Sequence, residues 1–264
     1  EAFAGYRRQA FHAREEQVRS VLPSGLREPM FGTLGRLWPK ADWAPRPLRA
    51  KTTLLSLGGS GEAGYARALA ILSPEQRELL YDAAFLRERG DYRAEQPLEK
   101  LMRDAPARSG LDRAQYADLK FWLPGDILTK TDRTSMAVGL EAREPLLDHR
   151  LIEFGARLPH RERLRGTSGK WLMKRTMERY LPDEILYRQK QGFVTPLAEW
   201  FRGPLASEAR AIASSELLTG NGLFARKALA RLADEHISGR SDHGRVLWQL
   251  LMLERSLRHL KPSA

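Results

Sequence analysis

The 264-residue sequence contains no cysteine. Disulfides, thiolate metal sites and a thiol nucleophile are therefore excluded within this chain. No apolar run approaches the roughly 18 residues that a membrane-spanning helix needs, so we expect no membrane partner. The lack of cysteine fits a reducing compartment, and we expect a cytoplasmic location.

Long runs of one charge are also missing, although the chain is basic. Its 44 Lys and Arg against 33 Asp and Glu give a formal net charge of +11. Basic and acidic residues are mixed along most of the chain, which is typical of solvated faces and argues against a dedicated nucleic-acid arm. We therefore expect no nucleic-acid partner. A basic nucleic-acid-binding protein stays open as an alternative, and it would place its arginines on one exposed face.

Strand signals are scarce, and helical patterns dominate the sequence. The best strand candidate is the run "KTTLLSL" at 51–57. Amphipathic helices are predicted over 206–218, 224–237 and 244–260. Ser73-Pro74 and Asp148 are typical helix starts, and Thr195-Pro196 has the same form.

Two glycine-containing motifs invite a nucleotide-binding interpretation. "GSGEAG" at 59–64 matches G-x-G-x-x-G, but the second strand that a dinucleotide fold needs is missing, which favours a glycine loop. "GTSGK" at 166–170 lacks the spacing of a phosphate loop. Lys170 is nevertheless predicted in the first turn of a helix opened by Ser168, where backbone N–H groups favour a phosphate oxygen. An exposed lysine without function is the alternative.

The stretch 126–138 predicts a helix that Asp126 caps and Gly139 ends. Asp126, Lys130 and Arg133 fall on one stripe, and Asp126 and Lys130 have the favourable spacing for an ion pair. Apolar and charged residues are spread around the helix, so we expect it to be covered on most sides. Asp132 lies off the stripe and is expected to pair elsewhere.

A loop follows this helix and carries Glu141 and Arg143. Working residues are common in such loops. A buried ion-pair network that only fixes packing is the alternative for the whole charged stretch.

Four segments together carry a resemblance to a known family. They are "EAFAGYRR" (1–8), "DILTKTDRTSMAVGLEAREPLLD" (126–148), "GKWLMKRTMERYLP" (169–182) and "ILYRQKQGFVTPLAEW" (185–200). In this order they resemble the synthetase domain of glutamine-dependent asparagine synthetases. The implied fold is mainly α: a truncated part of an α/β adenine-nucleotide-hydrolase-like (PP-loop ATP pyrophosphatase) synthetase domain, with few or no strands.

The resemblance also implies an activity, cofactors and site residues. The family adenylates a substrate carboxylate with ATP, releases pyrophosphate and forms an amide with ammonia from glutamine; magnesium bridges the phosphates. Lys170 would contact phosphate together with Lys130. Asp126 and Arg133 would line the site beside them, with support from Asp132, Glu141, Arg143 and Glu1, where Glu1 would be the last residue of the family's Ser-Gly-x-Gly-x-Asp-Glu loop.

The chain also departs from the family pattern. The ATP-cradling Ser-Gly-Gly-x-Asp-Ser loop and the amino-terminal cysteine for glutamine hydrolysis are absent, and Glu144 stands where an apolar residue is common. We therefore expect residues 1–264 to form the carboxyl-terminal helical part of a larger enzyme, inactive alone and without its cofactors.

Its expected partners are amino-terminal glutaminase and ATP-binding segments and a small-molecule acid, while a homodimer is left open. A β-lactam synthetase-like or polysaccharide-linked amidotransferase remains an alternative. So does a non-catalytic helical scaffold.

Overall fold

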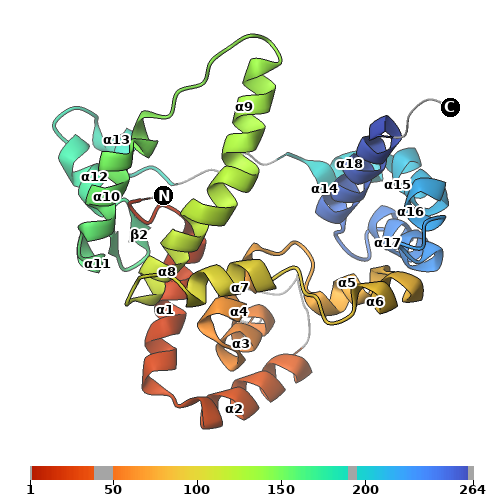
Figure 1. The fold of residues 1–264 in the computed structure, drawn as a ribbon, viewed down its shortest axis with the longest axis horizontal. Coiled ribbons are helices and arrows are strands. Elements are labelled where there is room, and N and C mark those ends of the chain that lie inside the picture. The colour runs from red at the N-terminus through yellow and green to blue at the C-terminus, as the bar shows by residue number, and fades with distance from the viewer. Residues whose placement is uncertain (1, 39–49, 190–194, 261–264) are drawn as a thin grey trace. The chain divides into compact units, whose positions relative to one another are not determined.

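The computed structural model describes residues 2–38, 50–189 and 195–260 and divides the chain into two compact units. Unit 1 comprises residues 1–69 and 94–189, and unit 2 comprises residues 70–93 and 190–264. Figure 1 shows the helices of both units and one short hairpin. The predicted mainly α fold class is confirmed. The sequence predicts residues 1–264 as one helical part of a larger enzyme and does not predict this division into two units.

Unit 1 holds most of the helices and the hairpin. Its elements are α1 (Arg7–Val21), α2 (Ser24–Leu37), α3 (Lys51–Gly58), α4 (Gly61–Leu69), α7 (Gln96–Arg103), α8 (Gly110–Ala117), η2 (Asp118–Leu128), α9 (Thr129–Met136), η3 (Pro145–Leu147), α10 (His149–Arg157), α11 (His160–Arg163), β1 (Leu164–Arg165), β2 (Ser168–Gly169), α12 (Trp171–Met177) and α13 (Asp183–Leu186).

The core of unit 1 lies where α4, α7 and α8 meet. Tyr65, Met102 and Ala114 are each no more than 1% exposed there. A smaller apolar cluster follows from α1 to the hairpin and includes Ala10, Ala13 and Leu164. This second cluster joins the helix that starts the chain to the hairpin that precedes Lys170.

The segment 51–58 is helical, so the predicted strand is wrong. Short apolar runs fit a buried helix as well as a strand, and here α3 packs along α2 and buries Ser56 and Leu57. Among the described residues no strand precedes the glycine motif at 59–64, and its last four residues already belong to α4. The motif is therefore neither a dinucleotide loop nor a long glycine loop.

One long helical stretch runs from Gly110 to Met136. Its middle, η2, is a π-helix that contains Pro124, and α9 continues from it without a break. The wider π turns accommodate the missing proline N–H, and the Thr129 hydroxyl donates to the Pro124 carbonyl at 2.6 Å. The prediction that Asp126 begins a helix is therefore wrong, while Gly139, at φ 70°, follows its end as expected.

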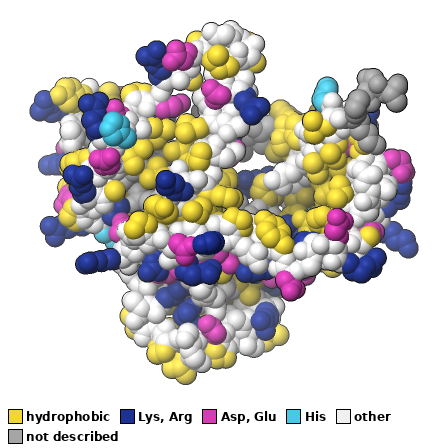
Figure 2. All heavy atoms as spheres, in the orientation of Figure 1, with side chains coloured by type: hydrophobic (Ala, Val, Ile, Leu, Met, Phe, Trp, Pro, Cys, Tyr) yellow, Lys and Arg dark blue, Asp and Glu magenta, His cyan; other side chains and the backbone are white. Residues whose placement is uncertain are grey.

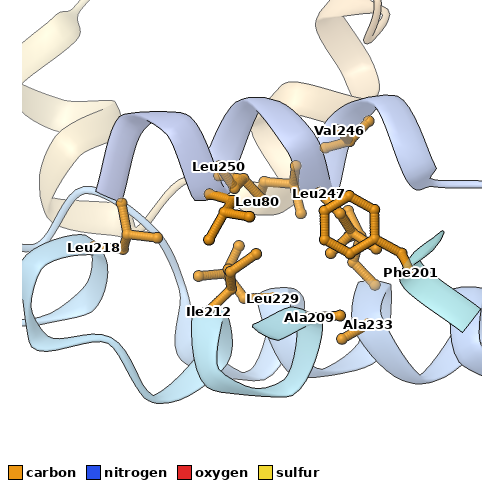
Figure 3. Packing of buried hydrophobic residues seen from close by; sticks show 12 residues of the cluster. Leu80, Phe201, Ala209, Ile212, Leu218, Leu229, Ala233, Val246, Leu247 and Leu250 are labelled. Atoms are coloured by element: carbon orange, nitrogen blue, oxygen red, sulfur yellow. The ribbon is translucent and has the colours of Figure 1, made fainter. Parts of the chain in front are cut away.

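The regular elements of unit 2 are helices among its described residues, joined by loops and by one isolated β-bridge between Tyr81 and Phe224. Its elements are α5 (Pro74–Leu80), α6 (Ala83–Arg89), α14 (Leu197–Arg202), α15 (Ala206–Ser214), α16 (Glu216–Thr219), α17 (Arg226–Ile237) and α18 (Gly244–Leu260). Figure 3 shows its core, where Phe201, Leu229 and Leu247 meet from three different helices. The three long carboxyl-terminal helices predicted from periodicity are confirmed, the first being interrupted between α15 and α16.

Of the helix caps predicted from the sequence, some are confirmed and others are wrong. Ser73 forms a complete capping box with Gln76, and the Asp148 carboxylate accepts from the Arg150 N–H, both as predicted. Ser168 is wrong as a helix start because it pairs in β2, so α12 begins later. Thr195 is wrong as well, since Pro196 occupies the cap position of α14. None of the helices in the described ranges is long and apolar enough to cross a membrane.

Candidate active site

Lys170 lies at the junction of the hairpin and α12. Strands β1 and β2 pair antiparallel, with Leu164 opposite Gly169. Lys170 then takes a left-handed conformation (φ 57°, ψ 31°) as the cap residue of α12. It therefore precedes the first turn of the helix, two positions earlier than predicted. A left-handed lysine is uncommon, and such backbone strain is often found at functional sites.

The backbone around Lys170 is fixed by residues 2–5 at the start of the chain. The Lys170 N–H donates to the Phe3 carbonyl at 2.8 Å, and the Gln115 amide donates to the Ala2 carbonyl at 3.0 Å. Gly169 lies so close to the Ala4 carbonyl that no side chain would fit there. These contacts hold Lys170 against the segment that directly follows Glu1.

The Lys170 side chain is half-buried and lies across Gly5. A Cβ atom on Gly5 would collide with the aliphatic part of the lysine. The side chain makes no ion pair with the residues that the structure describes. A half-buried ammonium group without a carboxylate partner is available for an anionic ligand. Glu1 itself lies outside the described residues, so its predicted role stays a prediction.

Lys130 and Asp126 form the predicted ion pair on the outside of the helical stretch. Their side chains are 3.4 Å apart and 63% and 42% exposed. Arg133 and Asp132 are exposed and make no ion pair within the described ranges. The expectation that this helix is covered on most sides is wrong for this chain, since Met136 and Val138 are also exposed.

Glu141 and Arg143 pair at 3.2 Å in the loop before η3, with both side chains at least 70% exposed. Ion pairs of this kind contribute little to stability. No hydrogen bond or ion pair in the described ranges joins Lys170 to Lys130 or to this loop. Lys170 and Asp126 are the partly buried members of the predicted set among the described residues, and the roles of all these residues stay predictions.

Asp118 forms a buried network that the sequence did not predict. Its carboxylate is 1% exposed and accepts hydrogen bonds from Arg8 at 3.0 Å, from Gln9 at 2.7 Å and from Tyr65 at 2.7 Å. Asp118 begins the π-helix, Arg8 and Gln9 begin α1, and Tyr65 belongs to α4. The network therefore joins the segment after Glu1 to the stretch that carries Lys130.

Arg8 adds aromatic contacts to this network. Its guanidinium lies 3.9 Å from the Tyr6 ring centroid and 5.0 Å from the Trp122 ring centroid, and it also donates to the Tyr65 hydroxyl. Burial and the Asp118 charge raise the pKa of Tyr65, so its hydroxyl stays protonated and donates to the carboxylate. The sign of this network in the sequence was Asp118, an acidic residue in the middle of the apolar pattern of 111–123.

His12 is a second buried group on α1. Its side chain is 3% exposed and lies 5.0 Å from the Tyr65 ring. Burial, with a smaller contribution from the Arg19 charge, lowers the pKa of His12 to about 4, although Glu16, Glu62 and the Gly110 backbone oppose the shift. The ring is therefore neutral at pH 7.

The His12 shift predicts a pH-dependent loss of stability. The unfolded chain gains a proton near pH 6.5 and the folded chain only near pH 4. Stability is therefore highest above pH 6.5 and falls as the pH drops towards 4, with a total loss of about 3 kcal/mol. Urea unfolding of wild type and His12→Gln between pH 7.5 and 4.5 measures it, since the variant should lack this part of the slope. An NMR titration of the His12 ring with a midpoint near 6.5 would contradict it.

Comparison with protein families matches residues 1–258 to the family described as asparagine synthase. Over 141 residues the chain is 39% identical to a Mycobacterium tuberculosis protein named "Putative asparagine synthetase", covering 53% of this chain and 21% of that protein. It is 26% identical over 149 residues to Bacillus subtilis asparagine synthetase 1, covering 56% and 23%. No solved structure matches significantly.

The chain belongs to the asparagine synthase family, as its motifs indicated. This family has an adenine-nucleotide-hydrolase-like fold. The matched region spans about a fifth of the length of these curated relatives. Both relatives carry names that describe glutamine-hydrolysing enzymes.

Proposed function

We propose that this chain is part of a glutamine-dependent, asparagine synthetase-like amidotransferase and that Lys170 binds a phosphate of ATP. The observation that carries the proposal is the half-buried Lys170 side chain, which lies next to the segment after Glu1 and makes no ion pair with a described residue. The family match and the names of the relatives support the reaction class.

The proposed reaction has two steps. A carboxylate oxygen of the acid attacks the α-phosphorus of ATP, and the bond to the β-phosphate breaks to release pyrophosphate. Ammonia then attacks the acyl carbon of the acyl-adenylate, and AMP leaves together with a proton as the amide forms. A fixed ammonium group that meets the growing negative charge of pyrophosphate lowers the first barrier.

The other predicted residues have supporting roles in this proposal. Lys130 would contact phosphate, Asp126 would orient it through the observed ion pair, and Arg133 would extend the same wall. Asp132, Glu141, Arg143 and Glu1 would support the substrate pocket. The exposure of Lys130 supports this role, because a loosely paired ammonium group can turn towards an anion.

Of the two predicted cofactors, Mg²⁺ has less support from the structure than ATP. The residues that the structure describes contain no cluster of histidine and carboxylate groups that could hold a metal ion. Lys170 and Lys130 fit the phosphates of ATP by charge. We therefore assign phosphate binding to this chain and derive no step through the metal.

The proposed partners are a glutaminase segment, an ATP-binding segment and a small-molecule acid, and a homodimer stays open. Figure 2 shows Lys and Arg side chains spread over the visible face with acidic groups among them, which does not favour a nucleic-acid surface.

An isotope experiment tests the reaction class. The protein that carries this chain is incubated with ATP, Mg²⁺, glutamine and candidate acids labelled with ¹⁸O in the carboxylate. Adenylation followed by amide formation should transfer one ¹⁸O to AMP, with pyrophosphate formed in equal amount. Reactions without acid are the control. Formation of ADP and inorganic phosphate would contradict the proposal, because acyl phosphates rather than acyl-adenylates would then be intermediates.

A further inference from the structure

Unit 1 contains a hollow of about 470 Å³ that none of the predicted site residues line. It lies between α1 and the segment from α11 to the hairpin turn at Gly166. Ala10, Ala13 and Leu164 are buried apolar residues of its lining. They offer a small, flat apolar surface.

Basic and neutral polar side chains complete the lining. Arg14 and Gln17 come from α1, and His160 and Arg161 come from α11. No acidic side chain is among the lining residues. The hollow therefore has two permanent positive charges and an apolar lining.

The two arginines are poorly neutralised by the protein. Arg14 makes no hydrogen bond or ion pair with the parts of the chain that the structure describes. Arg161 only reaches its neighbour Glu162, at 3.5 Å, and its side chain is 79% exposed. Other exposed arginines, such as Arg157, Arg226 and Arg231, each pair with a carboxylate.

The geometry of an arginine selects among anions. Its planar guanidinium offers paired N–H donors that match two oxygens of a phosphate. A neutral histidine adds one N–H donor, and burial followed by the Arg163 charge lowers the pKa of His160, so its ring is neutral at pH 7. An anion without an apolar part would leave the alanine surface unused.

We propose that this hollow binds a small phosphomonoester, with its phosphate between Arg14 and Arg161 and its apolar part on Ala10, Ala13 and Leu164. The site is distinct from the proposed phosphate contact at Lys170, because Lys170 does not line the hollow. The inference does not depend on the amidotransferase reaction.

Phenyl phosphate is a suitable probe, because it combines a dianionic phosphate with a flat ring and lacks any nucleotide feature. Calorimetric titration should show saturable binding to the chain. Phenol, which has no charge, should bind at least about tenfold more weakly if the arginines supply charge-assisted hydrogen bonds. Equal binding of the two probes would overturn the proposal.

Variants locate the binding. The double variant Arg14→Gln/Arg161→Gln should raise the Kd for phenyl phosphate at least about tenfold. The control Arg157→Gln/Arg231→Gln removes the same charge outside the hollow and should change the Kd less than about twofold. All four arginines are exposed, so thermal unfolding should be unchanged.

The remaining outcomes are decisive as well. Lys170→Ala should leave the Kd unchanged, and loss of binding in that variant would place the anion at the proposed ATP site and overturn this assignment. No saturable binding to wild type, or equal loss in both double variants, would also overturn it. Failure of the ¹⁸O transfer experiment would leave this proposal unaffected.

Discussion

Replacing Lys170 with alanine is expected to lower the rate of pyrophosphate formation about 100-fold, measured in the protein that carries this chain. Loss of one fixed group that stabilises developing charge typically costs about 2–4 kcal/mol of transition-state stabilisation. The structure supports a direct effect on this rate, because the Lys170 side chain is half-buried across Gly5 and makes no ion pair with a described residue.

Lys174 provides a matched control on the same helix. It lies one turn after Lys170, and its ammonium is 5.5 Å from the Tyr187 ring centroid. Lys174→Ala should keep the rate within about threefold, whereas Lys170→Arg should recover part of the loss because the charge remains. If Lys170→Ala also kept the rate within about threefold, the proposed contact with pyrophosphate would be wrong.

Replacing Asp118 with alanine is expected to reduce the free energy of unfolding by about 4 kcal/mol. Removal of one partner from a buried ionic network leaves the others without compensation, which costs about 3–5 kcal/mol. Arg8, Gln9 and Tyr65 would each lose a hydrogen bond to the carboxylate. Urea unfolding at pH 7 measures the change.

Two further variants separate the network from a general charge effect. Tyr65→Phe removes the hydroxyl that donates to Asp118 and accepts from Arg8, and should cost about 2 kcal/mol. Asp104→Ala breaks an exposed pair with Lys100 and should leave the urea midpoint unchanged, because surface ion pairs contribute little. Equal effects of Asp118→Ala and Asp104→Ala would show that the buried network is unimportant for stability.

Local patterns predicted many elements because their causes are local. The apolar spacing of 226–237 and 244–260 requires only a helix with one buried face. The Ser73 capping box depends on residues three apart. Both features were predictable without knowledge of the rest of the chain.

The failures share a different cause. The run 51–57 was predicted as a strand because a short apolar segment fits both a strand and a helix, and only packing of α3 on α2 decided between them. Ser168 resembles a helix cap in sequence, but pairing of β1 with β2 placed it in a strand. The helix at 126 began earlier because the π-helix absorbed Pro124.

The candidate site likewise combines features that local sequence predicts with features that only tertiary packing decides. The residue types and spacing of 126–148 and 169–182 were sufficient to indicate the family, and the family match confirmed it. They could not show that Lys130 is exposed in this chain while Lys170 is half-buried. Burial depends on which distant segments meet, and residues 2–5 meet the hairpin from more than 160 positions away.

The sequence by itself determined the class of fold, the carboxyl-terminal helices and the family, since each depends on local spacing or on residue identity in order. Only the tertiary structure decided that Asp118 joins its own helix to α1 and α4 and that Arg14 and Arg161 border one hollow. Such arrangements arise from contacts between segments far apart in the chain, and no local pattern records which segments will meet.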